Sequence, residues 1–207
     1  VTYLDDDDIV YPFHLASLVR AAEGLDRDKA FVYSNYNRAL VRGRGSTAAV
    51  VQRLHIPVWK FDRNALLIQN RPPIHTWLHS RHLFDRFGGW DPSLSILHDW
   101  DFLLHVTLDI PLVGVARETC EYRIYLDLNN SVTGARARAL EELRRIYERH
   151  PSRSAEIELA RAAELAGVEH QVDMARELQT SLENGGVTHE DAARRYVADV
   201  FGFVSRS

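Results

Sequence analysis

The sequence contains one cysteine, Cys120, in 207 residues. A single thiol cannot build a disulfide framework within the chain, and this usage fits a protein of a reducing compartment. No apolar run approaches the roughly 18 residues that a membrane-spanning helix needs. The formal net charge is −4, which argues against a general nucleic-acid binder with a basic surface. We therefore expect a soluble, cytoplasmic protein that binds no nucleic acid.

Several familiar catalytic motifs are also missing. The sequence has no Ser–His–Asp nucleophile elbow, no glycine-rich phosphate loop and no dinucleotide-binding glycine fingerprint. It has no internal repeats and no low-complexity tract. Apolar residues make up 45% of the chain and charged residues 26%, which is ordinary for a globular protein. The length is sufficient for a substantial hydrophobic core.

The most informative stretch is an acidic run at the start of the chain. Tyr3 and Leu4 are β-forming residues that predict the end of a buried strand, and Asp5 to Asp8 follow without a break. Oxygen ligands at a strand end suit a hard divalent cation such as Mg²⁺ or Mn²⁺, shared with a phosphate. The alternative is a solvated acidic turn before a helix that Pro12 begins.

The remaining pattern predicts strands and helices in alternation, and from residue 132 onward helices alone. Residues 12–24 predict a helix with Leu15, Leu18, Val19 and Ala22 on its apolar stripe, followed by a strand at 30–34. Such a strand–helix–strand unit is typical of a parallel sheet. Residues 35–49 predict a basic surface loop, and Asn129-Asn130 a turn. Further strands are predicted at 48–54, 65–69, 111–115 and 120–125, and further helices at 80–87 and 99–108.

A second motif-rich stretch runs from Phe87 to His105. It contains Gly88-Gly89-Trp90-Asp91 and then His98-Asp99-Trp100-Asp101. Together with Leu4-Asp5-Asp6-Asp7-Asp8, these elements resemble family 2 of the glycosyltransferases. Their order and spacing match that family's hydrophobic-D-x-D-D, GGFD and E-D-W-D elements, and Asn70, Pro73 and Thr76 match a further one. The resemblance covers about residues 1–133 and implies an α/β domain of the GT-A fold.

The resemblance also implies a set of roles for the acidic residues. Asp5 and Asp7 match the positions that contact the ribose and the metal, and Asp8 matches a secondary metal position. A frame shifted to Asp6 and Asp8 is also possible, because all four residues of the run are aspartates. Asp99 matches the catalytic base of inverting members, and its place at a predicted helix N-terminus favours the ionised form. The implied cofactor is a divalent cation, Mn²⁺ or Mg²⁺.

Further residues are implied to bind the donor or the acceptor: Thr76, Gly88, Gly89, Asp91, His98 and Arg123. His98 departs from the glutamate that is more frequent in the family, and Tyr125 stands where a histidine often helps to hold the metal, so the third ligand stays open. His75, His79 and His82 are interpreted as scattered surface histidines, because no carboxylate or cysteine completes a metal set with them in the sequence. Cys120 is expected to be buried.

The chain begins inside a predicted strand, so the resemblance places the half that grips the nucleotide base upstream of Val1. We expect residues 1–133 to be the C-terminal part of the catalytic domain, inactive alone, and residues 134–207 a helical extension. Thr133 is a predicted helix cap, and Thr188 with Asp191 a capping box. The tail's mixed arginines and glutamates indicate a solvated face, with peripheral membrane contact as the alternative. The spacing from Val168 to Leu182 would allow pairing between copies of the chain.

The sequence thus predicts a metal-dependent, inverting hexosyltransferase of cell-surface glycan or polysaccharide synthesis. Its partners would be a nucleotide-diphosphate sugar and a glycan or lipid-linked acceptor. One alternative is a sugar-phosphate nucleotidyltransferase, which also uses an acidic strand end but needs a basic nucleotide-gripping loop. The other is a catalytically degenerate interaction or scaffold module. The departures at His98, at Tyr125 and at His105, where the family often has an arginine, favour it.

Overall fold

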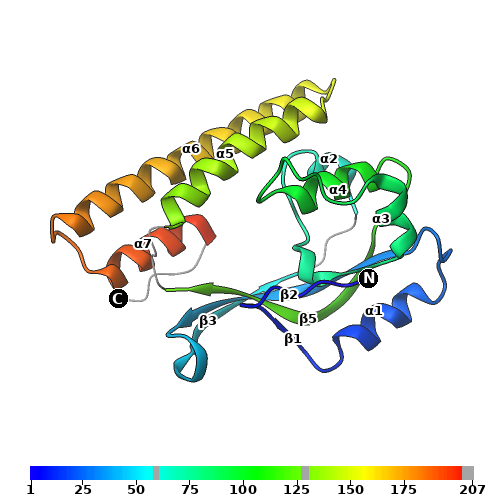
Figure 1. Cartoon of the computed structure of the whole chain (residues 1–207), viewed down its shortest axis with the longest axis horizontal. Coiled ribbons are helices and arrows are strands. Elements are labelled where there is room, and N and C mark those ends of the chain that lie inside the picture. The colour runs from blue at the N-terminus through cyan, green and yellow to red at the C-terminus, as the bar shows by residue number, and fades with distance from the viewer. Residues whose placement is uncertain (58–60, 127–130, 202–207) are drawn as a thin grey trace. The chain divides into compact units, whose positions relative to one another are not determined.

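The computed structural model describes residues 1–57, 61–126 and 131–201, without the side chains of residues 131–135. It is a mixed α/β structure with a five-stranded mixed sheet and, in the described part, seven α-helices (Figure 1). The chain divides into two compact units. The first consists of residues 1–38 and 54–123, and the second of residues 39–53 and 124–207. The turn predicted at Asn129-Asn130 and the side chain of Thr133 lie outside the described residues. The boundary predicted at 133/134 stays a prediction.

The sheet has the order β1-β5-β2-β3, and β4 pairs with β2. The strands are β1 (Ile9–Val10), β2 (Phe31–Arg42), β3 (Ala49–Ile56), β4 (Trp77–His79) and β5 (Val113–Tyr125). β1 pairs antiparallel with β5, and β4 antiparallel with β2. β1 begins after the predicted first strand of the strand–helix–strand unit, and β5 lies between β1 and β2 in the sheet.

Three predicted segments differ from the observed strands. β2 continues to Arg42, through most of the predicted basic loop, and only the short connection from Gly43 to Ala48 joins it to β3. β5 is one strand where two were predicted. Residues 63–66 form helix α2 (Arg63–Leu66) instead of the start of a strand. β3 and the start of β5 alternate between exposed and half-buried residues, and a strand with one face in solvent tolerates charged side chains.

The first unit also contains helices α1 (His14–Ala22), α3 (Arg81–Phe87) and α4 (His98–Val106). The predicted stripe of α1 is wrong in part: Leu18 is fully buried, whereas Leu15 is 53% and Val19 47% exposed. Figure 1 shows α2 and α4 on the same side of β2 and β5. Trp100 of α4 fixes that arrangement, since its indole N–H donates to the carbonyl of Leu66 at 2.8 Å.

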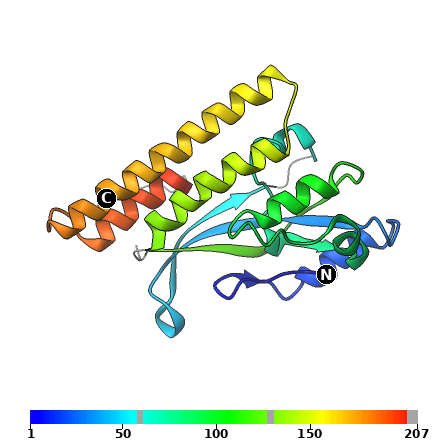
Figure 2. The same ribbon diagram turned by 45° about the horizontal axis from the view of Figure 1, so that its top comes forward.

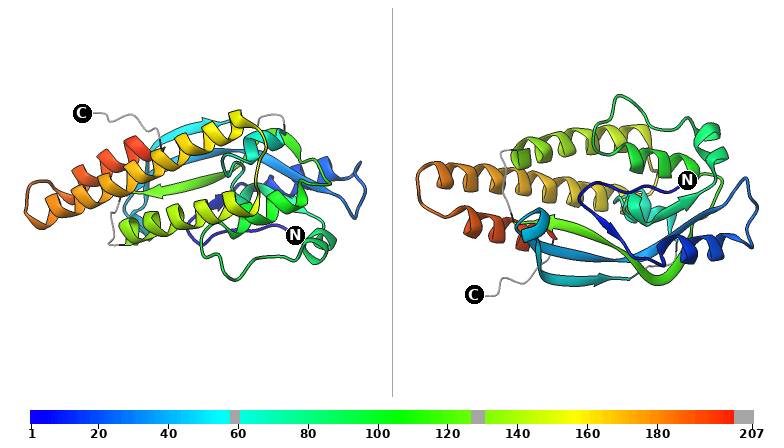
Figure 3. Two further views of the ribbon diagram at one scale, coloured as in Figure 1. Left: turned by 90° about the horizontal axis from the view of Figure 1, so that it is seen from above. Right: turned by 60° about the horizontal axis from the view of Figure 1, so that its bottom comes forward.

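The second unit contains α5 (Ser131–Arg149), α6 (Ala155–Glu183) and α7 (His189–Phe201). α5 and α6 lie side by side, and α7 runs beside α6 (Figures 2 and 3). The N-cap half of the predicted capping box forms, because Thr188 Oγ1 accepts from the Asp191 N–H at 3.1 Å; the Thr188 hydroxyl also donates to the Asp191 carboxylate at 2.7 Å. None of the helices in the described ranges is long and apolar enough to cross a bilayer.

Candidate functional site

A cavity of about 400 Å³ in the first unit contains residues from both motif-rich stretches. We call it the Asp99 cavity. It joins Asp5, from the acidic run, to His98 and Asp99, from the start of α4. Its other lining residues are Tyr36, Arg38, Asn70, Pro73, Ile74, His75, Ile96, Leu97 and Tyr122. Two segments that lie far apart in the sequence therefore face one space.

The acidic run forms a turn. The N–H of Asp8 donates to the carbonyl of Asp5 at 3.3 Å, and residues 1–8 contain no strand. The predicted strand at Tyr3 and Leu4 is therefore wrong. In an extended chain Asp5 and Asp7 would share one side, but a four-residue turn brings its first and last residues together instead. The side chains of Asp5 and Asp8 converge, and Asp7 stays exposed.

Asp8 is the buried member of the run. Its Oδ1 accepts the backbone N–H of Arg123 in β5 at 2.7 Å, and its Oδ2 lies 2.9 Å from His75 Nδ1. The side chains of Asp8 and His75 are each 1% exposed. Burial alone would lower the pKa of His75, but its close contacts with the Asp8 carboxylate and the Cys120 thiol outweigh burial and raise that pKa to about 9. The two residues form a buried ion pair that ties the acidic turn to the sheet.

Asp5, Asp8 and His75 also form a group that could hold a metal ion, with one ligand atom from each within 4.8 Å of the others. Asp8 Oδ2 and both ring nitrogens of His75 are buried, and none of them has a hydrogen-bond partner of good geometry among the described residues. Two carboxylates and one imidazole fit a divalent cation that takes nitrogen as well as oxygen, which favours Mn²⁺ over Mg²⁺. Binding would have to displace the proton of His75. Asp7 is not a member of this group.

Asp99 stands at the first turn of α4 and is partly buried. Its Oδ2 accepts from Asn70 Nδ2 at 3.0 Å, and its Oδ1 accepts from the Trp100 N–H at 2.8 Å. Desolvation raises the pKa of this carboxyl above its ordinary value, and both hydrogen bonds oppose the rise. A carboxylate with a raised pKa is a stronger proton acceptor, as a general base requires.

The neighbours of Asp99 on α4 have different surroundings. His98 lines the cavity and packs edge-on against Trp90 at 5.2 Å between ring centroids. Asp101 is 4% exposed and lies 3.6 Å from His105 one turn later. Asp101 is therefore buried beside His105 and is absent from the lining of the Asp99 cavity.

The glycine motif has a local structural explanation. Gly88 ends α3 in the left-handed conformation, with φ of 85°, and Gly89 has φ of 63°. A Cβ on Gly89 would lie 2.6 Å from the ring of Phe84. Asp91 Oδ1 accepts from the Ser93 N–H at 2.7 Å. Gly88, Gly89 and Asp91 do not line the Asp99 cavity.

Thr76 and Arg123 are likewise absent from the lining of that cavity. Thr76 is fully buried in the 3₁₀ helix η2 (Ile74–Thr76), and its hydroxyl donates to the Pro73 carbonyl at 2.7 Å. The guanidinium of Arg123 lies 3.3 Å from Glu121 Oε2. The positive charge of Arg123 is thus matched by Glu121, and its contribution to the site comes from its backbone N–H.

The interpretation of three histidines as surface residues is wrong for two of them. His75 and His79 are each 1% exposed, and only His82 is exposed. His79 Nδ1 donates to the Ser80 carbonyl at 2.8 Å, and its Nε2 accepts from the Tyr3 hydroxyl at 2.8 Å. The sequence interpretation missed His75 as a neighbour of the acidic run because no sequence spacing connects it to Asp8. It also missed Tyr36, Arg38 and Tyr122, which β2 and β5 bring to the cavity.

Comparison with known proteins found no family model that matches the chain and no matching curated protein.

Proposed function

We propose that the protein is a glycosyltransferase whose α/β domain is of the GT-A type. It would move a sugar from a nucleotide-diphosphate donor to an acceptor hydroxyl with inversion, in cell-surface glycan or polysaccharide synthesis. One observation carries the proposal: Asp5 of the first motif and His98 and Asp99 of the last line the same cavity. The single cysteine supports a cytoplasmic location.

Asp99 is the base in this proposal. The acceptor hydroxyl has a pKa far above neutrality, so it must lose its proton as it attacks the donor sugar. Oδ2 of Asp99 is held by Asn70, and Oδ1 by the Trp100 N–H. These bonds fix the direction in which the carboxylate accepts the proton, which favours attack in one orientation.

The diphosphate leaving group needs its developing charge neutralised. Asp5, Asp8 and His75 would hold the divalent cation that supplies this charge. Asp8 also carries the backbone bond from Arg123, so this residue both positions the turn and completes the cation group.

The first test is calorimetric titration of UDP and of GDP into the intact protein, each with and without Mn²⁺. Binding that requires Mn²⁺ and disappears in Asp5→Ala supports the proposal and identifies the nucleotide. No binding in any combination overturns it and favours an interaction module.

The second test is transfer by Asp99→Asn once a donor is known. Loss of the base should lower kcat by about 100-fold or more, whereas nucleotide affinity should be unchanged. Transfer at the wild-type rate would remove Asp99 as the base. Asp85→Asn, on the exposed face of α3, is the matched control.

A further inference from the structure

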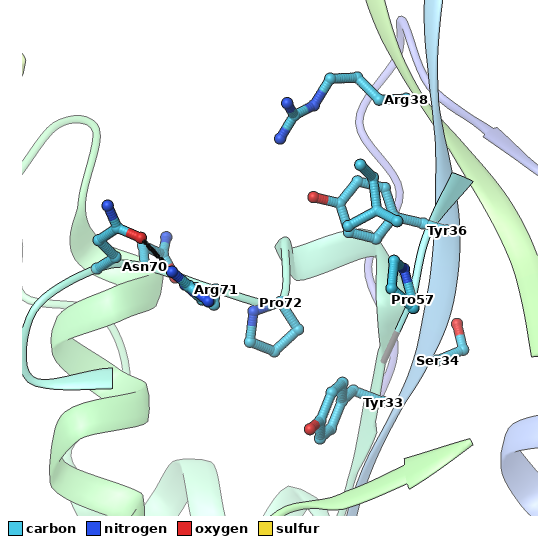
Figure 4. A pocket seen from close by; sticks show the side chains of 10 residues that line it. Tyr33, Ser34, Tyr36, Arg38, Pro57, Asn70, Arg71 and Pro72 are labelled. Carbon is cyan, nitrogen blue, oxygen red and sulfur yellow. Dashed lines mark hydrogen bonds between the residues drawn. The ribbon is translucent and has the colours of Figure 1, made fainter. Parts of the chain in front are cut away.

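A second cavity, of about 410 Å³, adjoins the Asp99 cavity. Figure 4 shows it from close by. We call it the Arg71 cavity, since Arg71 lines it and not the Asp99 cavity. Tyr36, Arg38 and Asn70 line both cavities. Its size lies in the range typical of small-molecule sites.

The lining of the Arg71 cavity is rich in hydrogen-bond donors and positive charge. Arg38 and Arg71 contribute guanidinium groups, and Tyr33 and Tyr36 contribute phenols. No acidic residue is among the described residues that line it. Guanidinium groups match the planar, two-oxygen edge of a carboxylate or phosphate. The chemistry of the lining therefore suits an anion.

The two phenols remain donors at neutral pH. Burial raises the pKa of Tyr33 to about 12. Burial also raises the pKa of Tyr36, while the charges of Arg38 and Arg71 act in the opposite direction. Both arginines therefore act on the same phenol from within the cavity lining. Figure 4 shows the Arg38 guanidinium and the Tyr36 hydroxyl directed toward the open space that Asn70 borders.

Arg71 is oriented before any ligand arrives. Its Nε and Nη2 both donate to Gln69 Oε1, at 3.0 and 2.7 Å. Holding the guanidinium by two bonds reduces the side-chain entropy that an anion would otherwise have to overcome on binding. Arg71 is an exposed residue, and these two bonds restrict the orientation of its guanidinium.

The shared wall connects this cavity to the proposed base. Asn70 borders the Arg71 cavity and donates to Asp99 Oδ2. A molecule whose anionic group occupied the Arg71 cavity would extend past Asn70 into the Asp99 cavity, where a hydroxyl is needed.

We propose that the Arg71 cavity binds an anionic group, a phosphate or a carboxylate, carried by the acceptor next to the hydroxyl that receives the sugar. The acceptor is then an acidic sugar or a phosphate-bearing glycan or lipid. The identification of the bound molecule as a glycosyl acceptor rests on the proposed function. The anion site itself does not depend on transfer activity.

The experiment is an NMR titration of the intact chain with glycerol 3-phosphate, with D-glucuronate, and with neutral glycerol. Saturable shifts of amides in residues 33–38 and 69–71 are expected with one or both anionic probes and not with glycerol. The tighter anionic probe identifies the group as phosphate or carboxylate. Arg38→Gln and Arg71→Gln should each weaken binding by about tenfold or more, the loss of a charge-assisted hydrogen bond. Arg27→Gln, at an exposed position outside both cavities, should bind like the wild type.

Equal binding of glycerol, or full affinity in both Arg38→Gln and Arg71→Gln, would overturn the proposal. Displacement of the anionic probe by UDP or GDP with Mn²⁺ would also overturn it, because the cavity would then belong to the donor diphosphate. Asp99→Asn separates this inference from the proposed function. That variant should keep the anion site intact, whereas its transfer activity tests only the role of Asp99.

Discussion

Asn70 Nδ2 donates a 3.0 Å hydrogen bond to Asp99 Oδ2, and this bond links the loop before η2 to the start of α4. Because Asn70 lines both cavities, this bond connects the wall of the Arg71 cavity to the proposed base. The bond stabilises the ionised carboxylate and so opposes the effect of burial on the pKa of Asp99. Removing the bond should therefore raise the pKa of Asp99 further.

Asn70→Ala should move the acidic limb of the pH–rate profile to higher pH. The base acts only when ionised, and without the amide donor its pKa rises further, so activity is lost earlier as pH falls. The measurement is kcat/KM against pH for the wild type and the variant. Asn64→Ala, at an exposed position of α2, should leave the profile unchanged. An unmoved acidic limb in Asn70→Ala would show that Asp99 does not set it.

Asp8→Asn should destabilise the first unit by about 3 kcal/mol or more, because it leaves the buried His75 without its counter-charge. Asp6→Asn, at an exposed position of the same turn, should change stability by less than about 0.5 kcal/mol. Urea unfolding followed by tryptophan fluorescence measures both. Similar small effects for the two variants would contradict a structural role of the Asp8–His75 pair.

His79 should make the fold less stable in acid. Burial lowers its pKa to about 4 from the ordinary 6.5, so below pH 6.5 the unfolded chain takes up a proton that the folded chain refuses. This proton therefore does not affect the free energy of unfolding above pH 6.5. As the pH falls from 6.5 toward 4, it lowers the free energy of unfolding by about 3 kcal/mol. His79→Gln should flatten this part of the stability curve in urea titrations at pH 7, 5.5 and 4.5. Burial lowers the pKa of His14 in the same direction, so a smaller acid dependence should persist.

Gly89→Ala should destabilise the protein by about 1–3 kcal/mol. The added Cβ would meet the Phe84 ring at 2.6 Å, and φ of 63° is unfavourable for a side chain. Gly167→Ala, inside α6 with nothing within 4 Å of its Cβ, should instead stabilise by about 0.5–1 kcal/mol. Chemical denaturation of both variants tests the pair, and equal signs would refute this explanation of the glycine motif.

Elements specified by neighbouring residues could be predicted from the sequence. α3 and α4 begin and end within one or two residues of their predicted bounds, and Thr188 caps the Asp191 N–H as predicted. A cap or a helix stripe depends on side chains within one turn of each other, so the chain carries its own evidence for them.

Burial and distant contacts could not be predicted in this way. The run from Asn35 to Arg42 mixes asparagine and arginine with the buried Ala39, Leu40 and Val41, and it continues β2 because the neighbouring strands complete its hydrogen bonds. No residue near His75 or His79 in the sequence indicates that they are buried. Their burial comes from the packing of η2 and β4 against distant parts of the chain.

The sequence by itself determined the order of the chemical groups: an acidic run, a glycine turn and an aspartate at a helix start. Only the tertiary structure decided which of them meet. The turn at Asp5–Asp8 pairs Asp5 with Asp8 rather than Asp7, and β5 and η2 hold Asp8 through Arg123 and His75. The physical reason is that a buried charge is stable only beside a partner, and its partner here comes from a distant part of the chain.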